Sequence, residues 1–415
     1  MRRLLCAICG LALLAGCAAP AASDAPAGPK AAATYVRPDG AVVLRPLTMP
    51  GGPENAMTDT GFYLCEYSGQ TPSPLLTFYD FETLSQRVVC RKSGCDHTGG
   101  DCPALVGGSP MRIGDWLYFF YPIDPDNSAL GMRVDRRDLN GENQEHLGEV
   151  GGQWMFSAGC YTDETHLYTY RGSDFVCIEL PACHVTVIER YRPDKPVDAE
   201  HLLTMTAPSG QVYYLGWDPD KVCPWKRLGQ EGDTVYGADP LNGWIYAWDA
   251  ATGHSRVLSR GLNQYLWTWD RPVGWDDQGR ENRWETPSSV QYWTGTLADG
   301  VLPVDIHGPS AQDRDAQVRV AVDLEDGSVT QCPLTDFWLD ASHPIRILAS
   351  TDYGLLVIPY TESTPGLQLG NDGTFYSAYA DVRTVYALIS REDFLAGVPR
   401  YQIFKSLFEK EGEAS

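Results

Sequence analysis

The stretch from Asp115 to Leu147, DWLYFFYPIDPDNSALGMRVDRRDLNGENQEHL, carries both sequence signals on which the predicted fold depends. It begins with a turn and an aromatic-rich strand, WLY at 116–118, and ends with a hairpin in which RDLNG at 137–141 leads into a second strand at Leu147. Asp, Asn and Gly tolerate the backbone angles of a tight reversal, and an Asp side chain can hydrogen-bond within its own turn. The stretch therefore predicts a small antiparallel sheet.

The same pair of signals recurs along the chain. Turn positions at 80, 138, 179, 249, 323 and 390 each follow a strand end, and an aromatic-rich or apolar strand precedes each of them. The fourth of these units pairs the strand QVYY at 211–214 with the hairpin at Asp249. Consecutive sheets of this kind are typical of an all-β β-propeller. We expect six blades, with seven or eight as alternatives, and the loose spacing predicts long loops between strands.

A closed ring needs its two chain ends to meet, because an open ring leaves two unpaired sheet edges. Short strand candidates lie at 35–36 and 41–44, ahead of the first predicted blade. We expect one of them to pair with the final blade near 401–404. The one helical turn that we expect is at 391–397.

The N-terminus is typical of an export signal. Arg2 and Arg3 precede an apolar run of eleven residues, LLCAICGLALL at 4–14, which is shorter than the roughly 20 residues of a membrane-spanning helix. The following LAGC at 14–17 resembles the bacterial lipobox. This resemblance implies cleavage before Cys17 and attachment of acyl chains, palmitate among them, to that cysteine; the alternative is an ordinary secretory signal.

The predicted organisation follows from that cleavage site. Residues 1–16 form the signal peptide, the Pro-rich and Ala-rich residues 17–33 form a flexible tether, and residues 34–410 form the β-propeller domain. The chain is then a surface lipoprotein, anchored by its N-terminal lipid to the cell membrane and facing the extracellular side.

Charge excludes one class of partner. The chain has 32 Lys and Arg against 54 Asp and Glu, a net charge of −22, and removal of the two signal arginines gives −24. Because so acidic a surface repels phosphate backbones, we expect no nucleic-acid partner.

One cluster has the residue types of a metal site. Cys90, Cys95, His97 and Cys102 are spaced as C-x4-C-x-H-x4-C. Three thiols and one imidazole suffice for a closed tetrahedral structural zinc site, although the spacing is not that of the well-known zinc fingers. Outside the cell, two of the cysteines could instead form a disulfide, and free thiols are a third reading.

These residues also carry a family resemblance. A hairpin strand that ends in Cys, followed by Cys-x-His and a further Cys, resembles uncharacterised β-propeller lipoproteins of gut anaerobic Firmicutes. The matching positions are Cys17, Cys90, Cys95, His97, Cys102 and Ala104. The resemblance implies a lipobox, a tether and a propeller, and it brings no established activity.

A second concentration is aromatic. Of the twelve tryptophans, nine lie between 217 and 293, and the turn-rich WTWDRPVGWDDQGRENRW at 267–284 contains Trp267, Trp269, Trp275 and Trp284. Flat rings bordered by polar side chains are suited to a sugar, so these four are candidate ligand-binding residues. The alternative is that the rings pack between blades.

The motifs of the common enzyme classes are absent. The chain has no G-x-S-x-G, H-E-x-x-H, P-loop or dinucleotide fingerprint, so we assign no catalytic residue and favour a protein that is not an enzyme. We expect a binding or interaction module whose partner is a glycan or a surface protein. A carbohydrate-active enzyme on a propeller scaffold and a structural envelope protein are the alternatives.

Overall fold

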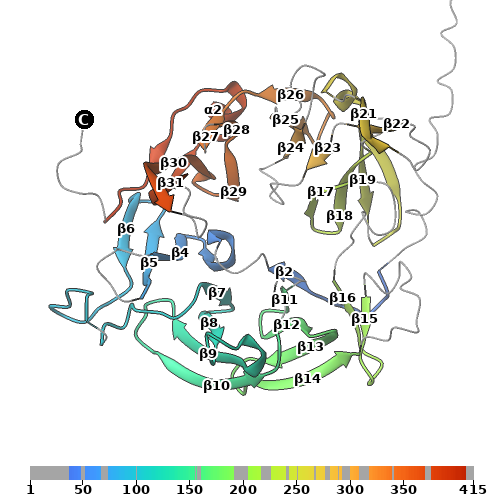
Figure 1. Ribbon diagram of the computed structural model, residues 1–415. Coiled ribbons are helices and arrows are strands. Elements are labelled where there is room, and N and C mark those ends of the chain that lie inside the picture. The colour runs from blue at the N-terminus through green and yellow to red at the C-terminus, as the bar shows by residue number, and fades with distance from the viewer. Residues whose placement is uncertain are drawn as a thin grey trace, which may run out of the picture.

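The computed structural model describes residues 37–47, 52–66, 73–99, 101–154, 156, 160–190, 204–215, 226–239, 243–249, 251–265, 268–275, 281–287, 289–291, 300–307, 317–338, 341–369 and 375–407. Most strands of these ranges form seven small sheets around a common axis, a seven-bladed β-propeller (Figure 1). The predicted all-β propeller is confirmed. The preferred count of six blades is wrong, and the alternative of seven is correct.

Five of the blades consist of four consecutive antiparallel strands and no other strand. The first is β3 (Met57–Thr58), β4 (Gly61–Glu66), β5 (Leu75–Asp80) and β6 (Ser85–Val88); the second is β7 (Pro110–Ile113), β8 (Trp116–Pro122), β9 (Gly131–Asp138) and β10 (Glu145–Gly151). The fifth is β17 (Lys226–Glu231), β18 (Thr234–Asp239), β19 (Trp244–Asp249) and β20 (Ser255–Ser259). The sixth is β23 (Ser289–Gln291), β24 (Val301–His307), β25 (Gln317–Asp323) and β26 (Val329–Cys332); the seventh is β29 (Arg346–Thr351), β30 (Gly354–Leu369), β31 (Phe375–Ile389) and β32 (Gln402–Ile403).

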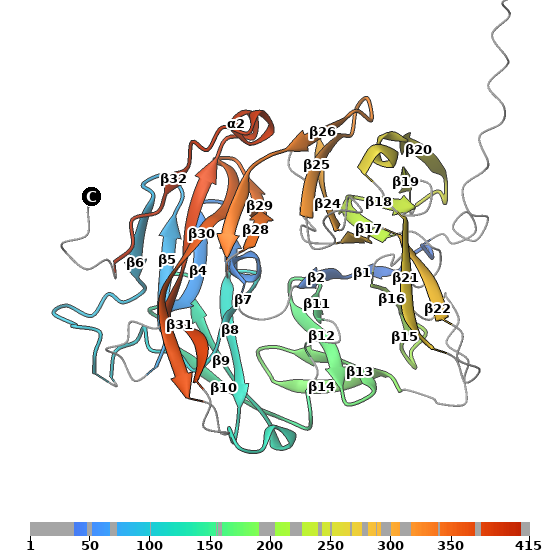
Figure 2. The same cartoon turned by 45° about the horizontal axis from the view of Figure 1, so that its top comes forward.

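The third and fourth blades each take a strand from the N-terminal segment. The third is β11 (Cys160–Thr162), β12 (His166–Arg171), β13 (Asp174–Glu179) and β14 (His184–Glu189), with β2 (Arg45–Leu47) antiparallel to β11. The fourth is β15 (Thr204–Thr206) and β16 (Val212–Tyr214), with β1 (Val42–Val43) parallel to β16. Figure 2 shows β1 and β2 following one another along the inner side of these blades.

Elements outside the blades are few in the described ranges. Two-stranded sheets are formed by β21 (Thr268–Trp275) with β22 (Glu281–Pro287) and by β27 (Thr335–Trp338) with β28 (Ala341–Pro344). The predicted turn at 391–397 is the helix α2 (Arg391–Ala396), which Ser390 caps and Gly397 ends in the left-handed conformation. Short 3-10 turns lie at Pro53–Ala56, Ser128–Leu130 and Gly261–Tyr265. None of the described helices is long and apolar enough to cross a bilayer.

The blade that the sequence missed lies between the third and fourth hairpin signals, at 179 and 249. The strand at 211–214 was expected in the same blade as the hairpin at Asp249, but it pairs with β15 and β1. The described part of the fourth blade, residues 204–215 with β1, has no copy of the Asp hairpin, and β1 comes from about 170 residues earlier in the chain. Neither feature leaves a local signal, which is why one unit was uncounted.

The expected pairing with the final blade is wrong for the candidate strand at 41–44, and the candidate at 35–36 lies outside the described residues. β1 and β2 pair within the fourth and third blades, whereas the seventh blade meets the first through the C-terminal segment. There the backbone of Lys405 donates to Leu84 O at 2.9 Å and accepts from Gln86 N at 3.2 Å. The unpaired sheet edges are thus joined at two places, by β1 and β2 on one side of the ring and by the chain after β32 on the other.

The core lies between neighbouring blades. At the junction of the seventh and first blades, the Phe62 and Tyr79 rings stack with centroids 4.6 Å apart, and the Phe404 ring meets Phe62 edge-on. Buried aromatic pairs of this kind contribute about 0.5–1.5 kcal/mol each beyond their area. The aromatic strands that predicted the repeat therefore also hold adjacent repeats together.

Candidate metal centre

The cysteine loop, residues 90–105, connects the first blade to the second. It leaves β6 where Val89 N donates to Leu76 O at 2.9 Å, and it returns where Leu76 N donates to Ala104 O at 2.8 Å. Both ends of the loop are therefore hydrogen-bonded to the same residue of β5. Gly100 lies outside the described residues.

Within the loop, tight turns bring the four predicted ligands together. Cys95 N donates to Lys92 O at 3.2 Å, Gly94 has a φ of 71°, and His97 has a φ of 63°. The left-handed conformation is uncommon for a residue with a side chain and needs support from its surroundings. On the far side of the loop, Cys102 N donates to Gly99 O at 3.0 Å.

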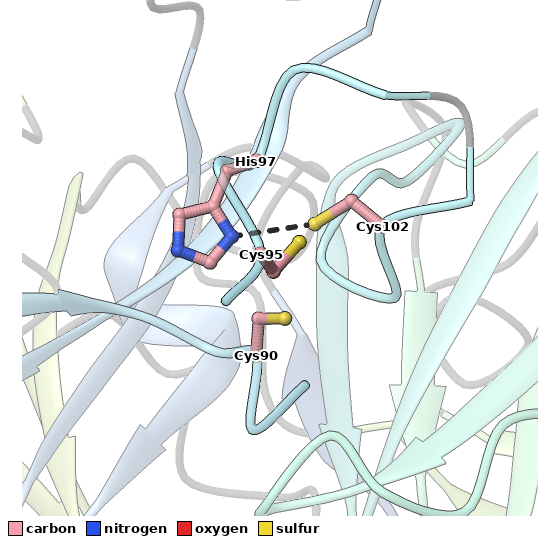
Figure 3. Close-up of side chains that lie close together, drawn as sticks. All are labelled: Cys90, Cys95, His97 and Cys102. Carbon is pink, nitrogen blue, oxygen red and sulfur yellow. Dashed lines mark hydrogen bonds between the residues drawn. The ribbon is translucent and has the colours of Figure 1, made fainter. Parts of the chain in front are cut away.

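The four side chains point toward one another (Figure 3). The Cys90, Cys95 and Cys102 sulfurs and a His97 ring nitrogen all lie within 4.8 Å of one another, and His97 Nδ1 is 3.4 Å from Cys102 Sγ. With metal bonds of about 2.0 Å to nitrogen and 2.3 Å to sulfur, two ligands of a tetrahedral zinc are roughly 3.5 Å apart. The residues thus form a Cys3His cluster within metal-binding distance.

Two thiols of the cluster have opposite tendencies to ionise. A backbone hydrogen bond from His97 holds the pKa of the Cys95 thiol below its usual range. Burial raises the pKa of the Cys102 thiol to about 11. A buried thiol becomes a thiolate when a cation compensates its charge, and a metal ion supplies that cation. The chemistry of the donor set therefore suits a divalent metal.

Residues of the second blade hold the outside of the loop. The Arg91 guanidinium donates to Glu142 Oε1 at 2.9 Å and to Asn140 Oδ1 at 3.0 Å, both in the turn between β9 and β10. Arg137 on β9 is 3% exposed, and its Nη2 donates to Leu105 O at 2.9 Å. Burial lowers the pKa of Arg137, while negative charge on Asp135, Cys65 and Cys102 would raise it.

Sequence reasoning missed both arginines. Arg137 lies 32 residues after Leu105, and Arg91 lies 51 residues before Glu142. No spacing rule links a loop to the next blade over such separations. A basic residue at the start of the cysteine loop was visible, but its partner was not.

The remaining predicted site residues lie elsewhere. Cys17 and Trp267 are outside the described residues. Trp269 and Trp275 are on β21 and Trp284 is on β22, so the stretch predicted as turn-rich forms a hairpin separate from the blades. Trp284 pairs with Arg271 in its register. In the order of the chain, the three tryptophans therefore lie between the fifth and sixth blades, well over a hundred residues after the cysteine loop.

A polar hollow of about 300 Å³ lies where three blades meet. It was not predicted. Residues from the first, second and seventh blades line it: Met57, Thr58, Asp59, Arg112, Ser350, Thr351 and Asp352. The Arg112 side chain spans two blades, since it donates to Met57 O at 2.8 Å and to Gly114 O at 3.1 Å.

The two aspartates of the hollow sit in equivalent turns. Residues 58–61 and 351–354 both have the sequence T-D-x-G, and each joins the first strand of its blade to the second. In both turns the Thr hydroxyl donates to the Gly carbonyl, at 3.0 Å for Thr58 and 2.8 Å for Thr351. The turns thereby present Asp59 and Asp352, both exposed, at one rim.

Comparison with known proteins adds little to the fold. No protein-family model matches the chain, and no curated protein matches it. The predicted resemblance to Firmicutes lipoproteins therefore stays a prediction.

Solved structures show similarity at low identity. The tricorn protease is 12% identical over 83% of this chain and 29% of its own, with a TM-score of 0.22. An ulvan lyase of polysaccharide lyase family PL25 is 10% identical over 89% of this chain and 95% of its own, with a TM-score of 0.28. The GH74 xyloglucanase of Xanthomonas campestris is 12% identical over 87% and 46%, with a TM-score of 0.27. The chain thus spans less than half of the first and the last of these, and scores this low say nothing about its function.

Proposed function

We propose that this protein is a membrane-anchored extracellular lipoprotein whose seven-bladed propeller is a binding or interaction module for a glycan, with a structural zinc ion held by Cys90, Cys95, His97 and Cys102. The polar hollow between the first, second and seventh blades is the observation that carries the binding role. The Cys3His cluster carries the metal.

The hollow has the chemistry of a site for a polyhydroxylated ligand. Asp59 and Asp352 offer carboxylate acceptors, and the hydroxyls of Thr58 and Thr351, which already donate to their own turns, can accept further hydrogen bonds. The Arg112 side chain lines the same hollow and adds a positive charge to it. A small number of polar groups that converge in a concave site is typical of small-molecule binding.

A glycan array tests the binding role. We expect the purified protein to retain a glycan, and the double variant Asp59→Asn/Asp352→Asn to lose at least tenfold in affinity. The control is Asp126→Asn, an exposed aspartate outside the hollow, which should bind as the parent does. Equal binding by all three proteins would move the site elsewhere, and retention of no glycan would remove the glycan role.

Metal analysis tests the zinc centre against a disulfide. We expect one equivalent of zinc per chain in protein purified without reductant, and a loss of that zinc in His97→Ala. A disulfide in place of the metal would show as two fewer thiols on titration of the denatured protein and as unchanged metal content in the variant.

Labelling tests the anchor. With radiolabelled palmitate supplied to an expressing bacterium, we expect label on the parent and on Cys9→Ser, and none on Cys17→Ser. Release of the Cys17→Ser protein from the membrane fraction should accompany the loss of label, because that variant carries no acyl chain to anchor it. Equal labelling of the two variants would contradict lipidation at Cys17.

A further inference from the structure

A zinc-loaded cysteine loop would be negatively charged and would need a positive charge near it. This inference rests on the zinc centre proposed above. Three thiolates and a neutral imidazole around a divalent ion leave a net charge of about −1. Cys102, one of the ligands, is 4% exposed, so part of this charge lies away from water. A buried charge is costly unless an opposite charge lies near it.

Arg137 is a buried cation on the adjacent blade. It is 3% exposed, and its Nη2 donates to Leu105 O, three residues beyond Cys102. Its Nε and Nη1 atoms are buried with no hydrogen-bond partner among the described residues. Its guanidinium carbon lies 5.6 Å from the centroid of the Phe119 ring. A guanidinium has five N–H donors, so Arg137 is far from satisfied by neutral groups alone.

The acidic residue that shares its face of the strand has other partners. Asp135, two positions before Arg137 on β9, accepts a hydrogen bond from the Tyr121 hydroxyl. It also lies 2.8 Å from His146 Nδ1 and 3.2 Å from Arg133 Nε. Its charge is therefore shared among several donors, and it offsets the charge of Arg137 incompletely.

We propose that Arg137 is the counter-ion of an anionic Cys3His metal centre, a positioning residue that holds the loaded cysteine loop against the second blade. A guanidinium bonded to the end of the loop that carries the metal thiolates stabilises the charged, metal-bound form of that loop. A disulfide or a set of neutral thiols would add no negative charge to the partial compensation by Asp135, so the burial of Arg137 favours the metal reading.

The placement of Arg137 has a mechanical consequence. The four ligands belong to the loop that leaves the first blade, whereas Arg137 belongs to the second blade. The loop is also tied to the second blade by Arg91, through Glu142 and Asn140. Binding of the metal thus strengthens the contact between the first two blades.

Competition with a chromophoric chelator measures the effect, with zinc as the probe and the whole protein as the sample. We expect Arg137→Met to bind one zinc with an affinity 10- to 100-fold below that of the parent, the range found when an outer-shell partner of a ligand is removed. Arg137→Lys, which keeps the charge, should recover most of this loss. The matched control is Arg136→Met, because Arg136 is the preceding residue on β9 and its side chain pairs with Glu145 instead. Its affinity should equal that of the parent.

A second measurement covers the case in which Arg137→Met folds poorly. In the metal-free background His97→Ala, replacing Arg137 by Met should no longer destabilise the protein, because an uncompensated buried cation has been removed. In the zinc-loaded protein the same change should lower the denaturation midpoint.

The outcomes separate the two proposals. Parent protein that binds no zinc would refute the zinc centre itself. Parent protein that binds zinc while Arg137→Met binds it equally tightly, or while Arg136→Met loses as much, would refute the role of Arg137 and leave the metal centre standing.

Discussion

Truncation of one buried leucine tests how the ring is held together. Leu44 lies between β1 and β2, it is 2% exposed, and its backbone N donates to Tyr214 O at 2.9 Å. Its side chain packs at the junction of the third and fourth blades in a cluster with Tyr168, Phe175, Ile188, Ala207 and Leu215. Leu44→Ala removes this side chain from a site where residues of three separate segments meet.

The expected loss is about 2–5 kcal/mol, the range for a buried leucine whose surroundings cannot collapse into the cavity. If a domain of this size unfolds as one unit, its unfolding entropy converts that loss into a fall in Tm of roughly 3–6 °C. Val43→Ala is the matched control, since Val43 is the preceding residue and is 49% exposed. It should cost less than about 1 kcal/mol.

Denaturant unfolding followed by tryptophan fluorescence and by circular dichroism measures both variants. If the N-terminal segment holds the third and fourth blades together, Leu44→Ala should lower the free energy of unfolding clearly more than Val43→Ala does, at an unchanged m-value. Equal and small losses for both would mean that β1 and β2 lie on the propeller without supporting it.

Three further changes test other parts of the fold. Arg319 and Asp305 are 2% and 5% exposed and form a buried ion pair with an Nε to Oδ1 distance of 2.6 Å. Arg319→Ala should therefore lower the free energy of unfolding in a denaturant titration by about 3–5 kcal/mol. A loss under about 1 kcal/mol would contradict the pairing. Burial alone would raise the pKa of Asp163, but hydrogen bonds from neighbouring backbone and hydroxyl groups lower it to about 2. The ionised Asp163 carboxylate therefore adds about 1–2 kcal/mol to the free energy of unfolding, after allowance for solvent; this is present above pH 4 and lost as the pH falls toward 2. Asp163→Asn should flatten the acid limb of a curve of stability against pH. An unchanged limb would contradict this role of Asp163. Gly141 has a φ of 74°, and a Cβ there would lie 2.6 Å from Val89 Cγ1. Gly141→Ala should therefore destabilise the protein by about 1–3 kcal/mol, through the contact between the first and second blades. An unchanged Tm would show that the turn relaxes freely.

Local chemistry made the repeating unit readable from the sequence. Asp138 begins a hairpin whose turn is closed by its own carboxylate, which accepts from the backbone N of Asn140 at 3.2 Å and of Glu142 at 2.8 Å. Asp249 and Asp323 do the same in later blades. Because such bonds span a few residues, the sequence shows them directly.

The Cys3His cluster was readable for the same reason. Its ligands lie within thirteen residues, so a short loop with Gly94 at a turn suffices to bring them together. The choice between metal and disulfide was not readable, since both use the same cysteines. The convergence of His97 on Cys102 and the burial of Arg137 depend on the folded loop and on a strand of the next blade.

Sequence alone therefore determined the all-β class, the hairpin unit and the candidate ligands, all of which depend on neighbours along the chain. Tertiary structure decided the fourth blade, and with it the count of seven, as well as the two closures of the ring, the place of Arg137 and the polar hollow that Asp59, Arg112 and Asp352 share. Each of these brings together residues tens to hundreds of positions apart. Such contacts are chosen by packing of the whole ring, for which no short stretch of the chain carries a signal.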